Sequence, residues 1–256
     1  MTTLPLFSII TVTRNAAETL AATIESVESQ SFHDFEYIVC DGLSSDRTPE
    51  IALNSNLAKS GNLKFFSEQD SGIYDAMNKG LKRASGQYLI FLNAGDVFHN
   101  DNTLQIISSS ISNNDSPDIV YGQTEIVDNR GKRLAGRHLI APKELTVKSF
   151  SNGMVVCHQA FIPKKAIAPN YDTSYRFSAD YKWCIECVER AKNSLLIDEI
   201  LIDYLFGGVS DKNRLKSLKE RFKIMCQFFG TFPTMLRHIG FIPRFIRRTK
   251  LENNFS

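Results

Sequence analysis

Long apolar runs are absent from this sequence of 256 residues, because no stretch approaches the about 18 residues that a membrane-spanning helix requires. No basic leader precedes the first strand-like run, so we expect no signal peptide. Hydrophobic residues make up 43% of the chain and charged residues 23%, which is typical of globular proteins with a buried core. The length suffices for one large α/β domain or two small ones.

Cysteine is scarce. The five cysteines form no evenly spaced framework, which argues against a disulfide-stabilised secreted protein. Cys184 and Cys187 form a Cys-x-x-Cys pair, but they lie in a helical-looking stretch with no second pair to complete a zinc site. We interpret them as buried small apolar residues, with metal or redox chemistry as the alternative. From this cysteine usage we expect a reducing compartment and a cytoplasmic protein.

The chain as a whole has little excess of either charge, because its net charge is +2. The charged residues are nevertheless unevenly distributed along the sequence. Residues 212–256 hold eleven Lys or Arg and two acids, so this segment carries about +9 and the rest about −7. Such a basic segment either lies on an anionic surface, such as a membrane leaflet, or forms a solvated helix face. The sequence leaves both interpretations open.

The first half of the chain alternates strand-like and helix-like patterns. Continuous apolar runs bounded by polar residues predict buried parallel strands, and apolar residues at helical spacing predict helices between them. This rhythm is typical of a doubly wound sheet, whose ligands bind at the carboxyl ends of the strands. The predicted strands are 7–12, 35–40, 63–67 and 88–92, and the predicted helices are 16–30, 47–59 and 73–84.

The second half is less regular. Residues 128–131 form a turn signal between two short strand-like stretches. Further patterns predict strands at 155–163 and 195–205, a helix at 180–191 and an amphipathic helix at 212–229. We expect one main domain over 1–211, made of halves 1–100 and 101–211. A basic, amphipathic helical appendage over 212–256 follows it.

Polar side chains follow three of the predicted strands. Thr13 and Asn15 come after the first strand, Asp41 after the second, and the run from Asn93 to Asp96 after the fourth. Because the carboxyl ends of parallel strands meet at one edge of a sheet, we expect these side chains to lie close together. Carboxylates and amides there can accept hydrogen bonds from a nucleobase or ribose, and a carboxylate can hold a divalent cation against a diphosphate.

These segments resemble the opening of the family 2 glycosyltransferases, which are inverting enzymes of the GT-A fold. The matching sequences are FSIITVTRN at 7–15, TIESV at 23–27, DG at 41–42 with SDRT at 45–48, and FLNAGD at 91–96. The resemblance covers residues 7–100 strongly and extends to about residue 210. It implies a mixed α/β sheet with a Rossmann-like nucleotide-binding half and an acceptor half.

The resemblance also implies roles for single residues. Thr13 and Asn15 would line the nucleotide and Asp41 would read its base, while Asp70 would help to hold the nucleotide sugar. Lys79 would add positive charge near the phosphates. Two alternatives stay open from the residues themselves: Asp70 before Ser-Gly is also ordinary turn chemistry, and Asp46 could simply cap the helix that follows it.

The metal motif departs from the usual pattern of this family. The family commonly shows Asp-x-Asp-Asp, whereas this chain has Asn93, Ala94, Gly95 and Asp96. The resemblance implies Mg²⁺ or Mn²⁺ held by Asp96, with Asn93 binding the ribose or a metal-bound water. His158 lies in a segment that resembles the donor-facing part of the family and is a second candidate ligand. A buried structural histidine and a loss of metal dependence are the alternatives.

The catalytic base of the resemblance is Asp180, which lies at the start of a predicted helix. Inverting transfer needs a carboxylate to accept the proton of the attacking hydroxyl. A helix-capping or first-turn acid is the alternative reading of Asp180. Asp172 and Glu186 are nearby acids that we do not choose. The loop at 206–210 contains two adjacent glycines and either closes over the acceptor or is an ordinary turn.

Together these features predict an inverting glycosyltransferase of cell-surface polysaccharide or glycolipid assembly. The donor would be a nucleotide sugar, with UDP favoured, and the acceptor a saccharide or lipid-linked saccharide. The basic segment could bring the protein to the inner face of the cytoplasmic membrane. The alternative is a non-catalytic nucleotide-sugar-binding module. A nucleotidyltransferase is disfavoured because the loop after the first strand lacks glycine, and we expect no nucleic-acid partner.

Overall fold

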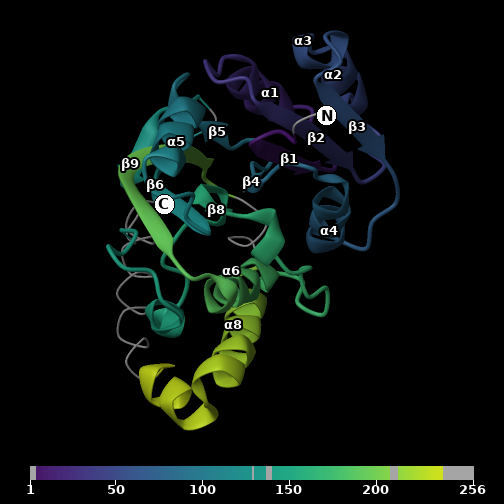
Figure 1. Ribbon diagram of the computed structural model, residues 1–256. Coiled ribbons are helices and arrows are strands. Elements are labelled where there is room, and N and C mark those ends of the chain that lie inside the picture. Colours follow the sequence, from purple (N-terminus) through teal and green to yellow (C-terminus); the bar gives the residue numbers. More distant parts are fainter. Residues whose placement is uncertain (1–3, 129, 137–139, 208–212, 239–256) are drawn as a thin grey trace.

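A four-stranded parallel sheet forms the first half of the protein, as a computed structural model describes it over residues 4–128, 130–136, 140–207 and 213–238 (Figure 1). The strand order is β3-β2-β1-β4, and all seven residues of β1 are buried. This burial explains the continuous apolar runs, because helices cover both faces of the sheet. The strands are β1 (Phe7–Thr13), β2 (Phe35–Asp41), β3 (Leu63–Ser67) and β4 (Tyr88–Phe91).

Helices alternate with these strands as predicted. Helix α4 packs on one face of the sheet, where Met77 and Leu81 meet the side chains of Ile10 and Ile38. Helix α1 packs on the other face (Figure 1). The helix predicted over 47–59 is broken at Ser55, whose extended backbone ends one helix and whose side chain caps the next. The helices are α1 (Leu20–Glu28), α2 (Thr48–Asn54), α3 (Asn56–Lys59) and α4 (Ile73–Arg83).

The second half builds a five-stranded sheet in the order β5-β9-β6-β7, with β8 also paired to β6. Strands β6 and β9 run parallel, and the other pairs are antiparallel. A bridge between Tyr88 and Lys164 connects this sheet to the first. The predicted mixed α/β class is therefore confirmed, with its strands divided between two sheets. The strands are β5 (Val97–Phe98), β6 (Ile119–Val127), β7 (Arg133–Gly136), β8 (Phe161–Pro163) and β9 (Ser194–Leu205).

The structure differs from the predicted elements in one shortened strand and one additional helix. The strand predicted over 155–163 is formed only by β8, because residues His158–Ala160 make a 3₁₀ turn (η2). Helix α5, over Thr103–Ser112, was not predicted. The helices predicted near 180–191 and 212–229 are confirmed as α6 (Ala179–Arg190) and α8 (Arg214–Phe229). The remaining 3₁₀ turns are η1 (Val147–Asn152) and η3 (Lys165–Ile167).

Helix α8 shares a hydrophobic core with the main domain. Its Ile224 and Met225 are buried in the same cluster as Trp183 of α6 and Phe150 of η1. The predicted domain boundary near residue 212, and most of the loop at 206–210, fall outside the described residues, so the division at 211 stays a prediction. Cys184 and Cys187 are buried in α6, as the apolar interpretation expected. Within the described part of the chain, no helix has the length and apolarity to cross a membrane.

The carboxylate of Glu36 ties the amino ends of the first sheet together. Its oxygens accept hydrogen bonds from Ser8 Oγ of β1 at 2.5 Å, Lys64 Nζ of β3 at 2.7 Å and Gly86 N, before β4, at 3.1 Å. Burial opposes its ionisation, but the hydrogen bonds from Lys64, Ser8 and Ser85 outweigh burial and lower the pKa of Glu36 to about 2. The ionised carboxylate therefore holds four strands in register.

We predict that Glu36→Gln lowers the free energy of unfolding at neutral pH by on the order of 2–3 kcal/mol, because an amide cannot replace these charge-assisted bonds. The folded-state pKa is depressed, so this contribution is present above about pH 4.5 and lost as the pH falls toward about 2. Urea unfolding of both proteins at several pH values measures the difference. A difference that stays constant from pH 6 to about pH 2.5 would contradict this role.

Candidate active site at the strand ends

Asp41 lies at the carboxyl end of β2 and is 2% exposed. Its carboxylate accepts hydrogen bonds from Ser44 N at 3.0 Å, from Ser67 Oγ at 2.7 Å and from the Ser44 hydroxyl. Gly42 follows directly, and a Cβ there would lie 2.1 Å from Asp70 Oδ2. The predicted residues Asp41 and Asp70 therefore lie at one edge of the sheet, with glycine as the residue that fits between them.

Asn15, Asp46 and Asp70 also stabilise the local backbone. Asn15 has a positive φ of 50°, and its Oδ1 accepts a hydrogen bond from Ser45 N at 2.9 Å, which joins the loops after β1 and β2. Asp46 accepts hydrogen bonds from Thr48 N at 3.0 Å and from Ala17 N at 3.1 Å, so it fixes the loop before α2, whose N-cap is Arg47. Asp70 Oδ1 accepts from Gly72 N at 2.9 Å, so its turn chemistry is present as well.

Two buried oxygen atoms at this edge have no hydrogen-bond partner. They are Thr13 Oγ1, at the end of β1, and Asn93 Oδ1, two residues after the neighbouring strand β4. A buried polar atom that lacks a partner costs roughly 1–3 kcal/mol, and such atoms are rare in folded proteins. Both residues were predicted to face the nucleotide. A ligand that donates hydroxyl or N–H groups would satisfy both atoms.

The loop that carries Asn93 and Asp96 is fixed by its neighbours. Thr23 of α1 donates its hydroxyl to the Asp96 carbonyl at 2.9 Å and accepts from Gly95 N at 2.8 Å. Gly95 has a φ of 103°, and a Cβ there would lie 2.6 Å from Leu205 Cδ2. A carboxylate at position 95, as in the usual family motif, would therefore not fit without movement of Leu205.

Asp96 faces the protein interior. Its two oxygens accept hydrogen bonds from Gln159 Nε2 at 2.6 Å and from Leu205 N at 3.0 Å. Burial raises the pKa of Asp96 to about 7, although both hydrogen bonds act in the opposite direction. Because both oxygens already accept hydrogen bonds from protein donors, this carboxylate does not fit a divalent cation as it lies. The predicted Mg²⁺ or Mn²⁺ at Asp96 stays a prediction, and we assign no chemical step to it.

His158 belongs to a buried aromatic cluster. Its Nε2 lies 2.7 Å from Tyr171 Oη, and its ring packs against Phe91 and Trp183. Burial lowers the pKa of His158 to about 4, while the charge of Asp180 raises it slightly. The side chain is 5% exposed. In this position His158 packs within the aromatic cluster, which agrees with its interpretation as a buried structural histidine. Its predicted contact with a metal stays a prediction.

Asp180 is the second residue of α6. Its Oδ1 accepts a hydrogen bond from Tyr74 Oη of α4 at 3.0 Å, so the carboxylate contacts an element 106 residues away. Ser178, which precedes the helix, makes no side-chain cap. Tyr74 stacks on Tyr171, which in turn stacks on Trp183 of α6. The Tyr74 hydroxyl thus orients one oxygen of Asp180, whose side chain remains partly exposed.

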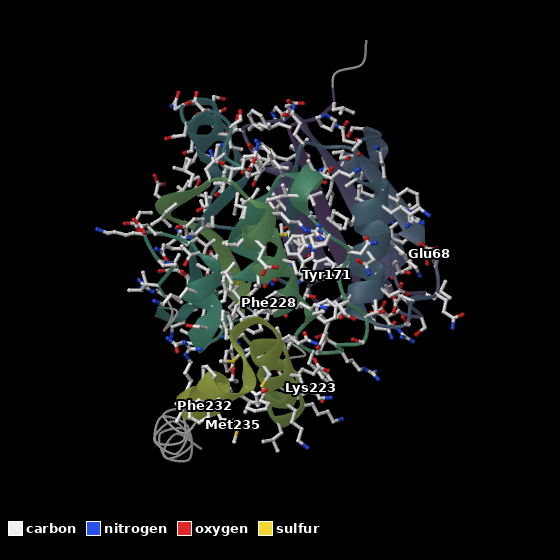
Figure 2. All side chains as sticks on the ribbon, turned by 60° about the horizontal axis from the view of Figure 1, so that its bottom comes forward. Glu68, Tyr171, Lys223, Phe228, Phe232 and Met235 are labelled. Atoms are coloured by element: carbon white, nitrogen blue, oxygen red, sulfur yellow. The ribbon has the colours of Figure 1, made fainter. Side chains whose placement is uncertain are left out.

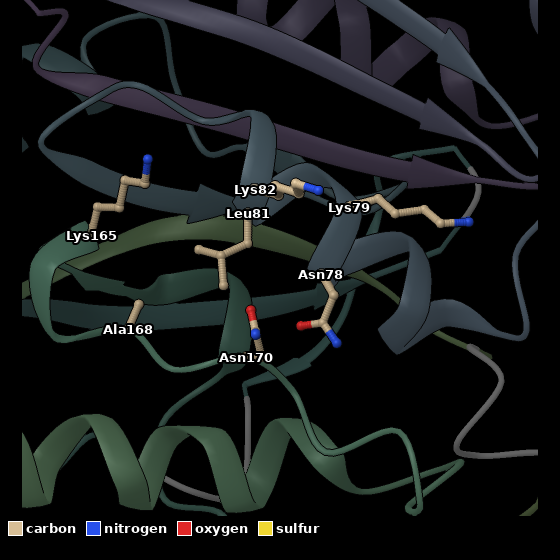
Figure 3. A pocket seen from close by; sticks show the side chains of 7 residues that line it. All are labelled: Asn78, Lys79, Leu81, Lys82, Lys165, Ala168 and Asn170. Carbon is tan, nitrogen blue, oxygen red and sulfur yellow. The ribbon is translucent and has the colours of Figure 1, made fainter.

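Lys79 lies on α4 and contacts residues of the same region of the chain. Its Nζ donates to the carbonyl of Gln69 and lies 3.4 Å from Asp75 Oδ2. The residue also lines a cavity of about 420 Å³ between α4 and the segment 165–170 (Figure 3). None of the other predicted site residues lines this cavity. The predicted contact of Lys79 with phosphate stays a prediction. The lining residues are Asn78, Lys79, Leu81, Lys82, Lys165, Ala168 and Asn170.

A separate cluster in the described residues has the composition of a metal site. His99, which follows β5, Glu125 of β6 and Asp203 of β9 have ligand atoms within 4.8 Å of one another. His99 Nδ1 lies 2.8 Å from Asp203 Oδ1, and Arg133 Nε lies 3.0 Å from Glu125 Oε1. These residues could hold a cation, and none of them was predicted. Arg133 already supplies a positive charge to this cluster.

Several residues of the site were missed in the sequence. Thr23, Tyr74 and Gln159 were given no role from the sequence, and their contacts join elements far apart in the chain. Tyr74 is the most informative omission, because it is buried on α4 like the core residues around it. No local pattern distinguishes a core tyrosine from one that orients a carboxylate.

Comparison with known proteins identifies relatives of this chain. A model of the family described as Glycosyl transferase family 2 matches residues 8–168. A curated "PGL/p-HBAD biosynthesis glycosyltransferase" of Mycobacterium bovis is 34% identical over 226 residues, covering 84% of each chain. "UDP-Glc:alpha-D-GlcNAc-diphosphoundecaprenol beta-1,3-glucosyltransferase WfgD" of Escherichia coli is 28% identical, covering 87% of this chain and 86% of its own.

Solved structures share the fold. The crystal structure of S. aureus TarS 1-349 superposes with a TM-score of 0.69 at 18% identity, covering 92% of this chain and 72% of that one. The same protein in complex with UDP gives a TM-score of 0.67 at 20% identity, with 92% of this chain and 74% of that one covered. At this identity the likeness establishes the fold, and it agrees with the GT-A expectation.

The raised pKa of Asp96 predicts how the free energy of unfolding depends on pH. Its folded-state pKa of about 7 is raised above the usual 3.8, so its contribution to stability is complete below about pH 4 and lost as the pH rises through about 7. We predict that the unfolding free energy of the wild type falls across this window by on the order of 4 kcal/mol relative to Asp96→Asn. Gln159 can flip its amide to pair with the asparagine.

Chemical denaturation of both proteins between pH 4 and pH 8 measures this difference. Repeating the series with Mn²⁺ adds a test of the metal prediction, since a cation on the ionised carboxylate would stabilise the wild type alone at high pH. Parallel pH profiles for the two proteins would contradict the description of Asp96 as a buried acid.

Proposed function

The chain belongs to glycosyltransferase family 2, and from this premise we propose that it is an inverting glycosyltransferase with Asp180 as its catalytic base. The donor in this proposal is a nucleotide sugar bound at the edge formed by Thr13, Asp41 and Asn93. Its named glycosyltransferase relatives give no support to the alternative of a non-catalytic binding module.

The observation that carries the proposal is the orientation of Asp180 by Tyr74. General base catalysis requires a carboxylate whose geometry is fixed and whose free oxygen can reach the acceptor hydroxyl. Tyr74 Oη occupies one oxygen of Asp180 at 3.0 Å, and the stack of Tyr74, Tyr171 and Trp183 holds this hydroxyl in place. The other oxygen is left to accept a proton.

In the proposed reaction, Asp180 accepts the proton of the acceptor hydroxyl while that oxygen attacks the anomeric carbon of the donor sugar. The bond from this carbon to the diphosphate breaks on the opposite face, and the nucleoside diphosphate leaves with the electron pair. Configuration at the anomeric carbon is therefore inverted. Thr13 Oγ1 and Asn93 Oδ1 accept hydrogen bonds from the donor and so help to fix its position.

We propose UDP as the donor nucleotide. The similar fold of TarS has been crystallised with UDP and with UDP-GlcNAc, and the name of the relative WfgD specifies UDP-Glc. For the acceptor we propose a saccharide carried on a lipid. WfgD is named for a diphosphoundecaprenol-linked acceptor, and the mycobacterial relatives are named for PGL/p-HBAD biosynthesis. These names place relatives of this chain in the assembly of surface glycans.

The C-terminal helices support a proposal on location, namely peripheral contact with the inner face of the cytoplasmic membrane. Large apolar side chains are exposed on α8 and on the helical residues 231–238, at the end of the molecule where Figure 2 labels Phe232, Met235 and Lys223. Exposed apolar residues beside lysines are typical of helices that bind anionic lipid surfaces. The exposed apolar residues are Leu215, Leu218, Phe232, Met235 and Leu236.

We predict that Asp180→Asn lowers the rate of sugar transfer by roughly 10²–10⁴-fold, because an amide cannot accept the proton. UDP affinity should stay within about twofold, since the substitution keeps the shape of the side chain. Transfer to a lipid-linked saccharide from UDP-sugars is measured beside calorimetric UDP binding. Asp172→Asn is the matched control, because Asp172 is paired with Lys182 at 2.6 Å and is expected to leave transfer nearly unchanged. Equal activity of Asp180→Asn and wild type would refute the assignment.

We predict that the wild type sediments with vesicles that contain anionic lipid, and that Phe232→Ser with Met235→Ser reduces the bound fraction several-fold, since each lost apolar contact weakens insertion. Zwitterionic vesicles are the control and should bind less. The substituted side chains are 73% and 53% exposed, so the fold should be unaffected. Unchanged sedimentation of the double variant would exclude this surface as the membrane contact.

A further inference from the structure

Three side chains of the second sheet form a cluster of metal-ligating types, apart from the residues of the proposed transferase site. His99, Glu125 and Asp203 each offer one ligand atom, and these atoms lie within 4.8 Å of one another. His99 Nδ1 lies 2.8 Å from Asp203 Oδ1, although the two residues are 104 positions apart in the chain. The cluster is therefore assembled by the fold and by no local pattern of the sequence.

Strand register places the three residues on one face of the sheet. Asp203 is paired directly with Glu125 of β6 and with Val97 of β5. Residues directly opposite each other on adjacent strands share a face. His99 follows two residues after Val97 and so lies on the same face, and its N–H donates to Leu201 O at 3.0 Å. Figure 1 shows β5, β9 and β6 side by side, so the backbone of three strands positions the cluster.

The spacing of the ligand atoms suits a small dication. Zinc lies about 2.0–2.2 Å from imidazole nitrogen and carboxylate oxygen, so two donors in a tetrahedral shell are roughly 3.4 Å apart. The contact of His99 with Asp203 at 2.8 Å is shorter than this separation, and all ligand atoms of the cluster lie within 4.8 Å. Small rotations of the side chains would therefore bring one nitrogen and two oxygens around a single ion, with water in the fourth position.

The residue types select among metals. Imidazole is a ligand for zinc and other transition metals, whereas Mg²⁺ and Ca²⁺ prefer shells of oxygen atoms alone. A neutral imidazole and two carboxylates together carry two negative charges, which balance a dication. The side chains of His99, Asp203 and Glu125 are 33%, 20% and 13% exposed, so an ion can enter from solvent. The cluster therefore fits Zn²⁺ best.

Arg133 of β7 contacts the same cluster and would compete with an ion. Its Nε lies 3.0 Å from Glu125 Oε1, and its side chain is 64% exposed. Exposed ion pairs contribute little stability, so a dication can displace this guanidinium at little cost. A metal site and a simple ion pair thus make opposite demands on Arg133, which repels the ion in the first case and stabilises Glu125 in the second.

We propose that His99, Glu125 and Asp203 bind one Zn²⁺ ion that joins β5 to β6 and β9. The site goes beyond the proposed transferase function and does not depend on it. It is also separate from the Mg²⁺ or Mn²⁺ predicted at Asp96, whose two oxygens accept hydrogen bonds from protein donors.

The ion stabilises the strands on both sides of the Asp96 loop. Strand β5 begins directly after Asp96, and Asp203 lies two residues before Leu205, whose N–H donates to Asp96 at 3.0 Å. A cation at the cluster therefore fixes the two strands that position this loop. It takes no part in sugar transfer itself.

The test is calorimetric titration of Zn²⁺ into the metal-free protein and its variants. The wild type should bind one ion per chain. His99→Ala, Glu125→Gln and Asp203→Asn should each weaken binding by about tenfold or more, because each removes one of three ligands. His33→Ala is the matched control, since His33 is an exposed histidine outside the cluster, and it should change the affinity by less than about twofold. No binding by the wild type at submillimolar Zn²⁺, or equal affinity in all proteins, overturns the proposal.

Arg133→Gln keeps all three ligands and removes the competing charge. Its Zn²⁺ affinity should rise several-fold, because a like charge next to the ion is lost. Since the side chain of Arg133 is exposed, this variant should fold normally, and its result does not depend on the stability of the ligand variants. Equal or weaker Zn²⁺ binding by Arg133→Gln would contradict an ion beside Glu125.

Asp96→Asn distinguishes the cluster from the donor site. It should bind Zn²⁺ as the wild type does, because Asp96 is no ligand of the cluster. Loss of binding in Asp96→Asn, with full binding in His99→Ala, would place the ion at the donor site and overturn the proposal. Thermal unfolding gives a second readout, since Zn²⁺ should raise the melting temperature of the wild type and leave that of His99→Ala unchanged. An equal rise in both proteins would also contradict the assignment.

Discussion

The ionised carboxylate of Glu36 binds donors from β1, β3 and the turn before β4, and the rest of the structure depends on the register that this cluster sets. Parallel strands fixed at their amino ends place their carboxyl ends side by side. The end of β1 therefore lies beside the ends of β2 and β4, and Thr13, Asp41 and Asn93 meet at one edge. A buried charge at the amino ends of the strands thus stabilises the sheet that carries these groups at its opposite edge.

The second requirement is a contact between the two halves of the chain. The proposed nucleotide edge comes from the first sheet and the proposed base, Asp180, comes from α6. The hydrogen bond from Tyr74 of α4 joins Asp180 to the first half of the chain. Stacked rings of Tyr74, Tyr171 and Trp183 make this contact rigid. Helix α8 supports the same place from behind through Glu220 and Ser217. Helix α8 therefore stabilises the segment that leads into Asp180.

Local patterns predicted the first half of the fold well, because buried parallel strands and amphipathic helices leave continuous and periodic apolar signals. The break at Ser55, the 3₁₀ turn at His158–Ala160 and helix α5 escaped prediction. The break at Ser55 uses local hydrogen bonds of its side chain with Ala52 and Ala58, which a pattern of apolar residues does not reveal. The residue types of the site were readable at the strand ends, but the inward orientation of Asp96 depends on Gln159 and Leu205, 63 and 109 residues away. Tyr74 acquires its significance only through packing, because its hydroxyl reaches Asp180 from another element.

In the proposed function, the edge formed by Thr13 and Asn93 binds the nucleotide sugar and Asp180 faces the anomeric carbon. A crystal structure with UDP and an unreactive sugar donor tests this claim most directly. We expect hydrogen-bond donors of the ligand within bonding distance of Thr13 Oγ1 and Asn93 Oδ1. We also expect the Asp180 carboxylate on the side of the sugar opposite the diphosphate. A nucleotide bound elsewhere, with both oxygens still unpartnered, or a diphosphate on the same side as Asp180 would contradict it.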